Sequence, residues 1–410
     1  MKLKKLFLTA AVLTTTSFGI SNLEANAQTF SDLKSNHWAY NSVEQVSKKG
    51  LVTGYQDGSF KPSNHVTRAE FATFLSRLFD SKVRKPEAFT DVSETHWAKD
   101  AIEEGLALGF ILESDYKNNK FEPNKVMTRQ EIAKWLTNGL IASNAEYGEI
   151  ATTIQNGKYT LLPIAEMYKG GLNKSEYGNV GLMLGTGIMS GFEDGSFKTT
   201  GNTTRAEIAT ILIRFDEAMK KKPTDFKGLN ELIEVATTGT NMLSATKYTY
   251  WGIEANNFSN VVGKQHTFSR NNSGVGTLER MIFVEGTTLQ SALDNSVYAK
   301  MFVGKNTRLA PDSDTISIFV ETGFTPNHEK TTIDAYTNGQ TSSFIRNTGI
   351  QDKSVAKNFG LTTLDAENWG AFFKKGQKVK FWTESWFDYS KGTSDGFTTD
   401  DNSEFTLQLK

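Results

Sequence analysis

The chain has 410 residues, of which 38% are hydrophobic and 22% are charged, so it is long enough for two or more globular domains. Its formal net charge of −1 gives no bulk attraction for nucleic acid or for an anionic membrane surface, so any anion-binding site must be local. The absence of cysteine excludes disulfides, thiolate metal sites and cysteine nucleophiles.

The first 27 residues have the pattern of an export signal. Three lysines lie within the first five residues, residues 6–20 are apolar or small, and residues 25–27 read Ala-Asn-Ala, which fits a cleavage site. The apolar stretch is short and interrupted by Thr and Ser at positions 14–17, which argues against a membrane anchor. We expect a secreted chain that begins at Gln28 and keeps no membrane contact after removal of the signal.

A motif set recurs three times between residues 30 and 215. Its fullest form reads Phe-x-Asp, His-Trp-Ala, Gly-x-x-x-Gly, Asp-Gly-Ser-Phe and Thr-Arg-Ala-Glu. The Phe of the fourth motif precedes the Arg of the fifth by eight positions each time, in the pairs Phe60 and Arg68, Phe121 and Arg129, and Phe197 and Arg205. This fixed spacing indicates three copies of one structural unit.

Each copy has the pattern of helix, glycine turn and helix. In the first helix of the first copy, Ala39, Val43 and Val46 fall at i, i+4 and i+7, which is one helical face. Gly50 follows where a left-handed helix end is favoured. A unit of about 50 residues with one apolar stripe per helix is too small to be stable alone. We therefore expect the three copies to pack into one helical domain.

The second helix of each copy is predicted to begin at a capping box, with the pairs Thr67 and Glu70, Thr128 and Glu131, and Thr204 and Glu207. The box does not explain the Arg that follows each Thr, because a cation is mildly unfavourable in the first turn of a helix. Free amides at a helix start form an anion site, to which a guanidinium would add a bidentate fork. The alternative is an Arg bonded to a nearby Asp or to a loop carbonyl, and residue types alone leave both open.

These motifs resemble the S-layer homology (SLH) domain, over about residues 29–216. The resemblance implies an all-α trimer of repeats with pseudo-threefold symmetry and ligand grooves between the repeats. It also implies binding of secondary cell-wall polysaccharide, commonly through a ketal-pyruvylated terminal sugar. The pyruvyl carboxylate would be the anion that the arginines suggest.

Carried over by position, the resemblance assigns polysaccharide contacts to four kinds of residue. These are the arginines Arg68, Arg129 and Arg205 with the motif glutamates Glu70, Glu131 and Glu207; the carboxylates Asp32 and Asp91; the groove-lining Trp38 and Trp97; and Gly54 and Gly191, which would let the backbone approach the glycan. Asp32 and Asp91 would contact sugar hydroxyls or orient the site. The tryptophans could instead belong to the core, and the glycines could instead serve a turn with positive φ.

The three copies are unequal. Counting back from Gly187, the Asp position of the third copy falls on Lys169 and its Trp position on Ser175. The second copy lacks the second loop glycine and reads Glu113-Ser114-Asp115 there. We therefore expect at least one groove to be weak or lost, with the third copy the incomplete one.

The second half of the sequence has a different pattern of apolar and polar residues. Lys220–Pro223 is consistent with a linker, and residues 225–237 with a short helix. Alternating apolar and polar residues then predict strands at 246–253, 278–285, 297–303, 315–321, 379–389 and 404–409, a spacing typical of a β-sandwich. The expected fold is multidomain, an all-α repeat domain followed by an all-β domain. The expected units are a signal at 1–27, repeats at 28–85, 86–145 and 146–222, a linker with a short helix at 223–240, and a β-rich domain at 241–410.

Chemistry-bearing residues are sparse in the second half. Trp382, Glu384, Trp386 and Asp388 would share one strand face, as a carbohydrate platform or, as we favour, an inner face of the sheet. Glu384 and Asp388 lie too close along one strand to favour a glycosidase pair. The acidic segment 395–401 matches no EF-hand loop, so a solvated turn is favoured over Ca²⁺.

The sequence thus predicts a non-enzymatic protein of the cell wall or S-layer, without cofactor or metal. Its expected partner is the pyruvylated polysaccharide, with S-layer or self-association possible and no nucleic acid. The second half would have a structural, adhesive or S-layer-associated role. The alternative is a wall-anchored hydrolase whose catalytic site lies in the second half.

Overall fold

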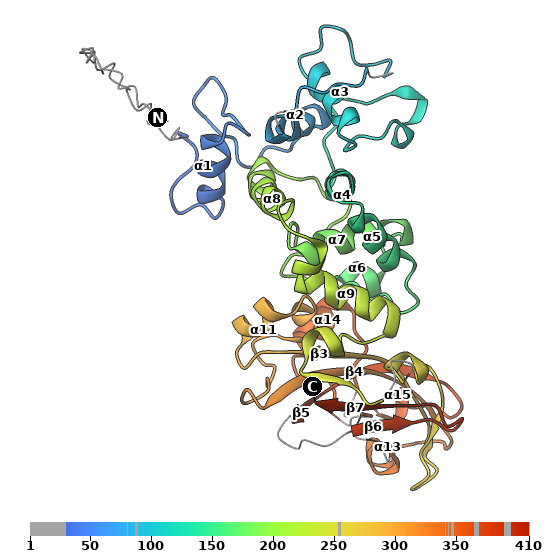
Figure 1. Ribbon diagram of the computed structural model, residues 1–410. Helices are drawn as coiled ribbons and strands as arrows, with labels where there is room; N and C mark the ends of the chain where they lie inside the picture. The colour runs from blue at the N-terminus through green and yellow to red at the C-terminus, as the bar shows by residue number, and fades with distance from the viewer. Residues whose placement is uncertain are drawn as a thin grey trace, which may run out of the picture.

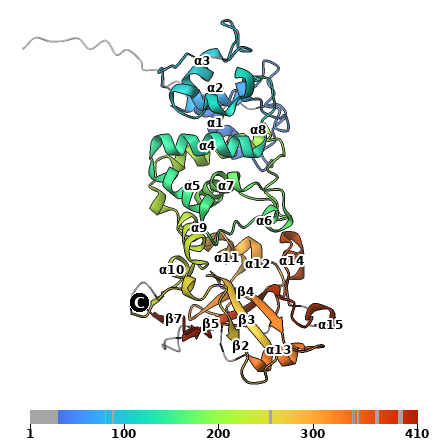
Figure 2. The ribbon, with the colours of Figure 1, turned by 90° about the vertical axis from the view of Figure 1, so that its right-hand side faces the viewer.

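The structure is a computed structural model that describes residues 30–79, 81–86, 89–252, 256–340, 342, 344–345, 348–364, 369–388 and 395–409. The expected signal and its cleavage site lie outside these residues. A helical part and a part containing two β-sheets follow each other along the length of the molecule (Figures 1 and 2). Among the described residues, no helix combines the length and the apolar character needed to cross a bilayer.

The helical part contains nine α-helices and four short 3₁₀ turns among the described residues. The α-helices are α1 (Tyr40–Lys48), α2 (Arg68–Phe79), α3 (Lys99–Ala107), α4 (Arg129–Ser143), α5 (Glu146–Asn156), α6 (Ala165–Lys169), α7 (Tyr177–Thr186), α8 (Arg205–Ala218) and α9 (Lys227–Thr238). The 3₁₀ turns are η1 (Glu113–Asp115), η2 (Lys117–Asn119), η3 (Lys174–Glu176) and η4 (Pro223–Asp225).

The predicted helix ends are confirmed. Helices α1, α3 and α7 are each followed by a glycine with a φ between 70° and 79°, at Gly50, Gly109 and Gly187. Helices α2, α4 and α8 each begin at a capping box, in which the Thr hydroxyl accepts the amide of the Glu and the Glu carboxylate accepts the amide of the Thr.

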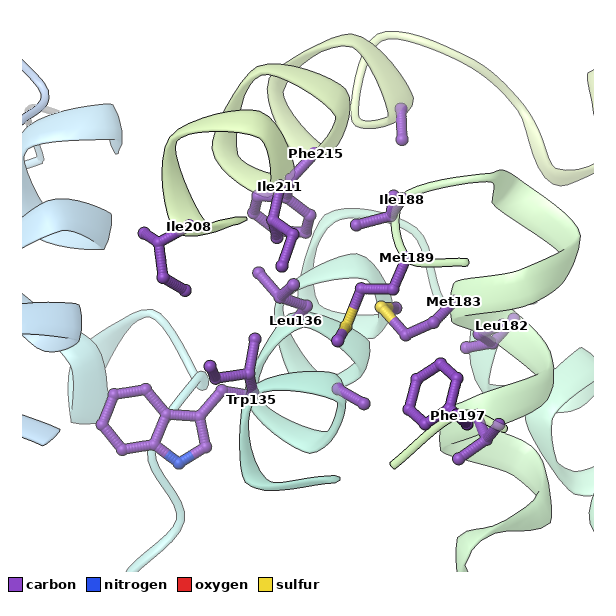
Figure 3. Packing of buried hydrophobic residues seen from close by; sticks show 14 of the residues in the cluster. Trp135, Leu136, Leu182, Met183, Ile188, Met189, Phe197, Ile208, Ile211 and Phe215 are labelled. Carbon is purple, nitrogen blue, oxygen red and sulfur yellow. The ribbon is translucent and has the colours of Figure 1, made fainter. Parts of the chain in front are cut away.

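The three repeats pack in a closed ring. Helix α3 packs on α2, α7 on α4, and α1 on α8, so the first helix of each repeat covers the second helix of the repeat before it. Three antiparallel bridges close the centre of the ring, joining His65 to Thr204, Thr67 to Val126, and Thr128 to Asn202. Buried side chains of α4, α7 and α8, among them Leu136, Met183 and Phe215, form part of the common core (Figure 3).

The expected linker at 223–240 contains a packed helix. Helix α9 lies against α5 and α7, and Leu229, Leu232 and Val235 are buried. The apolar stripe of α9 indicates a packed helix. The lysines that suggested a linker are confined to residues 220–222, before this helix. Residues 223–240 therefore belong to the helical part.

This packing predicts a difference between two truncated chains. A chain of residues 28–222 loses the three buried side chains of α9, which contribute about 1.5–3 kcal/mol each. We expect it to melt well below a chain of residues 28–240, or to aggregate, in a thermal scan followed by circular dichroism. Equal melting midpoints would contradict the assignment of α9 to the helical core.

The second part combines helices with strands. Its elements are α10 (Met242–Ala245), β1 (Tyr248–Tyr250), η5 (Phe258–Asn260), β2 (His266–Thr267), β3 (Gly274–Val284), α11 (Leu289–Asn295), α12 (Ala299–Phe302), β4 (Thr315–Pro326), α13 (Ile333–Gly339), α14 (Lys353–Phe359), α15 (Trp369–Phe372), β5 (Val379–Asp388), β6 (Asp395–Thr398) and β7 (Glu404–Leu409). The expectation of an all-β domain is therefore wrong. The predicted strand at 297–303 is the short helix α12, because a short apolar run fits a buried helix as well as a buried strand.

The strands form two antiparallel sheets, of order β2-β3-β4-β5 and β1-β7-β6. One face of the larger sheet shares an apolar core with the smaller sheet, as in the contact of Phe387 with Tyr248 at 5.5 Å between ring centroids. The other face is covered by helices, with Phe302 of α12 stacked on Phe319 of β4 at 4.5 Å. A sheet covered by helices on one face differs from the expected β-sandwich.

The core of the helical part continues into this helix-covered face. Tyr298 donates a hydrogen bond from its hydroxyl to the carbonyl of Leu161 at 3.0 Å. Arg280 donates from Nε to the carbonyl of Tyr159 at 3.2 Å. The third repeat and the sheets are thus joined by buried contacts.

Candidate functional site

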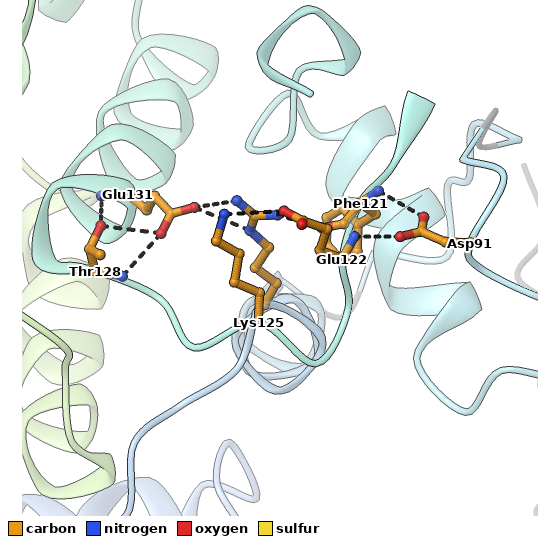
Figure 4. A network of polar contacts seen from close by, with 7 residues as sticks. Asp91, Phe121, Glu122, Lys125, Thr128 and Glu131 are labelled. Carbon is orange, nitrogen blue, oxygen red and sulfur yellow. Dashed lines mark hydrogen bonds and ion pairs between the residues drawn. The ribbon is translucent and has the colours of Figure 1, made fainter. Parts of the chain in front are cut away.

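A carboxylate holds the loop between the two helices of each repeat. Asp32 accepts the amides of Phe60 and Lys61 at 2.7 and 2.8 Å. Asp91 accepts the amides of Phe121 and Glu122, both at 2.8 Å (Figure 4). Both side chains are therefore positioned to orient the loop that borders each groove.

The third repeat keeps this carboxylate, contrary to the sequence expectation that Lys169 occupies its place. Glu166 accepts the amides of Phe197 and Lys198 at 2.9 and 2.7 Å. The segment from Glu166 to Gly187 is three positions longer than the matching segments of the other repeats, so counting back from the glycine missed it. The pattern Ile164-x-Glu166, which matches Phe30-x-Asp32, was the signal that could have found it.

Removal of this carboxylate should loosen the loop of the third repeat. Glu166→Ala leaves two loop amides without their acceptor, a loss of about 1–3 kcal/mol for each group that stays buried. We expect faster amide hydrogen exchange over residues 190–198 by mass spectrometry, and no such change in the control Glu193→Ala, which alters an exposed carboxylate of the same loop. Unchanged exchange in both variants would contradict this role.

Each motif arginine is buried and reaches into the following repeat. Every guanidinium donates to a Phe carbonyl of that repeat and lies near its capping-box glutamate. Arg68 contacts the Phe121 carbonyl at 2.7 Å and Glu131, Arg129 contacts the Phe197 carbonyl at 2.7 Å and Glu207 at 3.5 Å, and Arg205 contacts the Phe60 carbonyl at 2.8 Å and Glu70 at 3.7 Å. The structural alternative, an Arg bonded to a loop carbonyl, is thus present in all three repeats.

The idea of free amides at these helix starts is wrong. The amide of Arg129 donates to the Gly201 carbonyl at 2.9 Å, and that of Gln130 to the Thr199 carbonyl at 3.0 Å. The corresponding amides of α2 and α8 donate in the same way to the repeat that follows them in the ring. An anion at these sites would therefore be bound by side chains.

A groove of about 500 Å³ lies at the start of α8 and combines residues of all three repeats. Arg129 comes from the second repeat, Trp38 from the first, and Glu207, Arg214 and the loop 188–192 from the third. Two guanidinium groups and one carboxylate give these side chains a net charge of +1. Arg214 is exposed, and the sequence analysis did not single it out.

The groove tryptophans are exposed, which settles their alternative assignment to the core. Trp38 and Trp97 are 65% and 63% exposed. Each stacks on the histidine that precedes it, His37 at 5.6 Å and His96 at 5.7 Å between ring centroids. Large apolar side chains that are exposed to solvent are available for contact with a ligand.

The corresponding surface of the second repeat differs in charge and in its aromatic residue. Asn138 stands where α8 has Arg214, and Lys134 is paired with Asp115 at 2.6 Å. The counterpart of Trp38 would come from the third repeat, where Ser175 lies at the equivalent count from the glycine.

Arg68 is fully engaged at this surface. Its Nη1 donates to Glu122 at 3.0 Å, its Nε donates to Glu131 at 3.1 Å, and the ring of Tyr116 lies 5.1 Å from it (Figure 4 shows the two glutamates). Burial raises the pKa of Tyr116, so the phenol stays neutral. With Lys125, which pairs with Glu122 at 3.1 Å, and with Lys134 and Asp115, the charged groups sum to zero, from three cations and three carboxylates. In the groove at α8 the tryptophan comes from the next repeat, and the same arrangement would leave the groove of the second repeat without a tryptophan.

The first repeat has the same residue types as the third. Arg205 contacts the Thr53 carbonyl at 2.8 Å, and Arg77 occupies the position that matches Arg214. Together with Glu70 these residues again sum to +1. The repeat order of the ring assigns Trp97 to this groove, since α3 packs on α2.

Gly54 and Gly191 do not have the positive φ that a turn would need. A Cβ on Gly54 would lie 2.4 Å from the Phe30 ring, and one on Gly191 would lie 3.1 Å from the Ser196 carbonyl. Close packing within each repeat therefore explains both glycines, and Gly191 also lines the groove.

The strand face in the second half separates into buried and open positions. Trp382 is 1% exposed and packs on Phe302, so it belongs to the core, as favoured from the sequence. Glu384 and Trp386 line a separate pocket. In the acidic segment, Asp400 accepts bonds from Thr267, and Asp401 pairs with Lys264 at 3.0 Å. Within the described ranges, no group of three or more His, Cys, Asp or Glu residues could hold a metal ion.

Comparison with known proteins identifies the repeats. A model of the S-layer homology domain matches residues 29–72, 88–133 and 172–209. Over 109 residues, 25% of this chain, it is 39% identical to a cellulosome-anchoring protein of Acetivibrio thermocellus, covering 24% of that protein. Over 188 residues, 45% of this chain, it is 30% identical to an amylopullulanase of Thermoanaerobacterium thermosulfurigenes, covering 9% of that protein. Over 246 residues, 58% of this chain, it is 26% identical to S-layer protein EA1 of Bacillus anthracis, covering 26% of that protein.

The chain spans about a quarter or less of the length of these three relatives. The third match begins at residue 172, after Glu166, in agreement with the altered spacing there. The domains and the S-layer relatives indicate a secreted protein of the cell wall or cell surface.

Proposed function

We propose, starting from the three S-layer homology domains that this chain carries, that its helical part anchors it non-covalently to an anionic cell-wall polysaccharide. The groove at the start of α8 is the principal site, and the terminal ketal-pyruvylated sugar of the polysaccharide is its ligand. The sheet-containing part is displayed at the cell surface in a structural, adhesive or S-layer-associated role.

The observation that carries this proposal is the groove of about 500 Å³ that two guanidinium groups and an exposed indole line together. A guanidinium binds a carboxylate through paired hydrogen bonds, and an aromatic face packs on the apolar face of a sugar ring. Arg129 would contact the pyruvyl carboxylate together with Arg214, in competition with Glu207 at 3.5 Å. Trp38 would hold the sugar ring.

We further propose that the first and third repeats bind polysaccharide and the second does not. The first repeat has the same charge and residue types as the third, whereas the charges of the second cancel and its Arg68 is bonded to two glutamates. A carboxylate ligand at the second repeat would have to displace two ion pairs. Arg68 and Asp91 then serve the fold of the ring.

A pull-down tests the anchoring. The full secreted chain is incubated with purified cell walls and with the same walls after extraction of the secondary polysaccharide. We expect binding to the intact walls and its loss from the extracted walls. Equal binding to both would contradict the proposal and assign the affinity to peptidoglycan.

A second candidate is a wall-anchored hydrolase, since the relatives include proteins named amylopullulanase, exoglucanase and endo-1,4-beta-xylanase. Its test is release of reducing sugar or free amines from isolated walls by the second half of the chain. Soluble products at catalytic protein concentration would favour it, and their absence would favour display.

A further inference from the structure

A second pocket lies in the sheet-containing part, on the helix-covered face of the larger sheet beyond Trp382. Its volume is about 240 Å³, roughly eight times the share of one liquid water. Phe319 and Ser317 of β4 and Glu384 and Trp386 of β5 line it, and the loops at 307–308 and 348–351 complete it. It is separate from the grooves of the repeats.

Glu384 is the unusual group in this pocket. Glu384 is only 6% exposed, and it lines the cavity. Its Oε2 accepts the amide of Gln351 at 3.1 Å, and its Oε1 has no hydrogen-bond partner in the part of the chain that the structure describes. No ion pair joins Glu384 to a cation there. A buried carboxylate without a cation is costly, so it favours a ligand that supplies one.

The remaining lining fits a small cation on an alkyl chain. Phe319 gives an apolar surface, and the hydroxyls of Thr307 and Ser317 can accept hydrogen bonds. Trp386 presents a π face, one side of which lies 4.7 Å from the guanidinium of Arg308. The Trp386 indole also donates to the carbonyl of Arg308 at 2.9 Å, which fixes this wall of the pocket.

We propose that this pocket binds a primary ammonium group, such as a lysine-like side chain, by an ion pair with Glu384. The ammonium donates to Oε1 and its alkyl chain lies on Phe319. The occupant has the size of one amino-acid side chain, because the cavity is too small for a folded segment. This site is independent of the polysaccharide grooves.

The surrounding charges give the binding a pH dependence. Burial raises the pKa of Glu384 to about 7, with a smaller contribution from the negative charge of Asp352 at the start of α14. Glu321, on the same sheet face, is paired with Arg280, and Arg308 is held against Trp386. An ammonium binds only the ionised carboxylate, so affinity rises with pH through 7.

The test uses the full secreted chain and Nα-acetyl-lysine amide, whose amine stays charged between pH 6 and 8. We expect calorimetric binding at pH 8 that is about tenfold weaker at pH 6, as a group with a pKa of about 7 requires. The Nε-acetylated form of the probe should bind at least tenfold more weakly. Glu384→Gln keeps the acceptor for Gln351 and should lose the binding, whereas the exposed control Glu329→Gln should retain it.

Equal binding of the amine and its acetylated form would overturn the proposal. So would unchanged affinity in Glu384→Gln, or affinity that does not rise from pH 6 to pH 8. Because neither substituted residue lines the groove at the start of α8, wall binding should persist in both variants and shows that the protein is folded.

Discussion

Trp38→Ala should weaken binding to purified wall polysaccharide at least tenfold, about 1.4 kcal/mol, without changing the melting temperature. Trp38 is 65% exposed, so its removal costs the fold little, while the groove loses the surface on which the sugar ring would lie. The measurement is calorimetry or surface plasmon resonance at fixed salt, paired with a thermal scan.

Trp251→Ala is the matched control, because Trp251 is 58% exposed and belongs to the sheet-containing part. We expect it to bind like the unchanged chain. The double variant Trp38→Ala and Trp97→Ala should lose the remaining affinity, since the grooves of the first and third repeats would both lack their tryptophan. If Trp38→Ala and Trp251→Ala bind equally well, the assignment of the groove fails.

Glu231→Gln should stabilise the protein above neutral pH. Glu231 of α9 is 0% exposed, with Oε2 bonded to Ser296 and Asn241 and Oε1 without a partner among the described residues. Burial raises its pKa to about 7 from the usual 4.5 of a glutamate. The folded state therefore binds this proton more tightly than the unfolded state, and stability is lost as pH rises from 4.5 through 7.

The magnitude follows from the difference in pKa. Ionising Glu231 at pH 8 costs about 3 kcal/mol, since each pKa unit is worth 1.36 kcal/mol. The Gln variant should recover about 2–3 kcal/mol at pH 8, seen as a higher urea midpoint, and change little at pH 5. Glu329→Gln, an exposed control, should have no effect at either pH. A gain of equal size at pH 5 and pH 8 would show that charge is not the cause.

The repeats could be read from sequence because their motifs act locally. Thr67 and Glu70 are three residues apart and form the predicted capping box, and Gly50 ends its helix with the predicted positive φ. Which repeat would lose its groove could not be read, because Arg129 and Trp38 meet only when the ring closes. A count within one repeat shows that the third repeat lacks a tryptophan, but it cannot say which groove is affected.

The second half was harder for a related reason. Long strands such as β4 and β5 were predicted near their observed positions. The all-β assignment failed at α12, a helix of four residues that is too short to show a helical period and of which Ala299, Met301 and Phe302 are buried. The pocket at Glu384 also depends on loops at 307–308 and 348–351, which no strand pattern reveals.

The central claim is that the grooves of the first and third repeats recognise an acidic sugar. The most direct measurement is titration of the full secreted chain with the isolated terminal sugar unit of the wall polysaccharide, before and after removal of its pyruvyl group, at one salt concentration. The account predicts two bound ligands per chain and at least tenfold tighter binding of the pyruvylated form. Equal affinity for the two forms would contradict it.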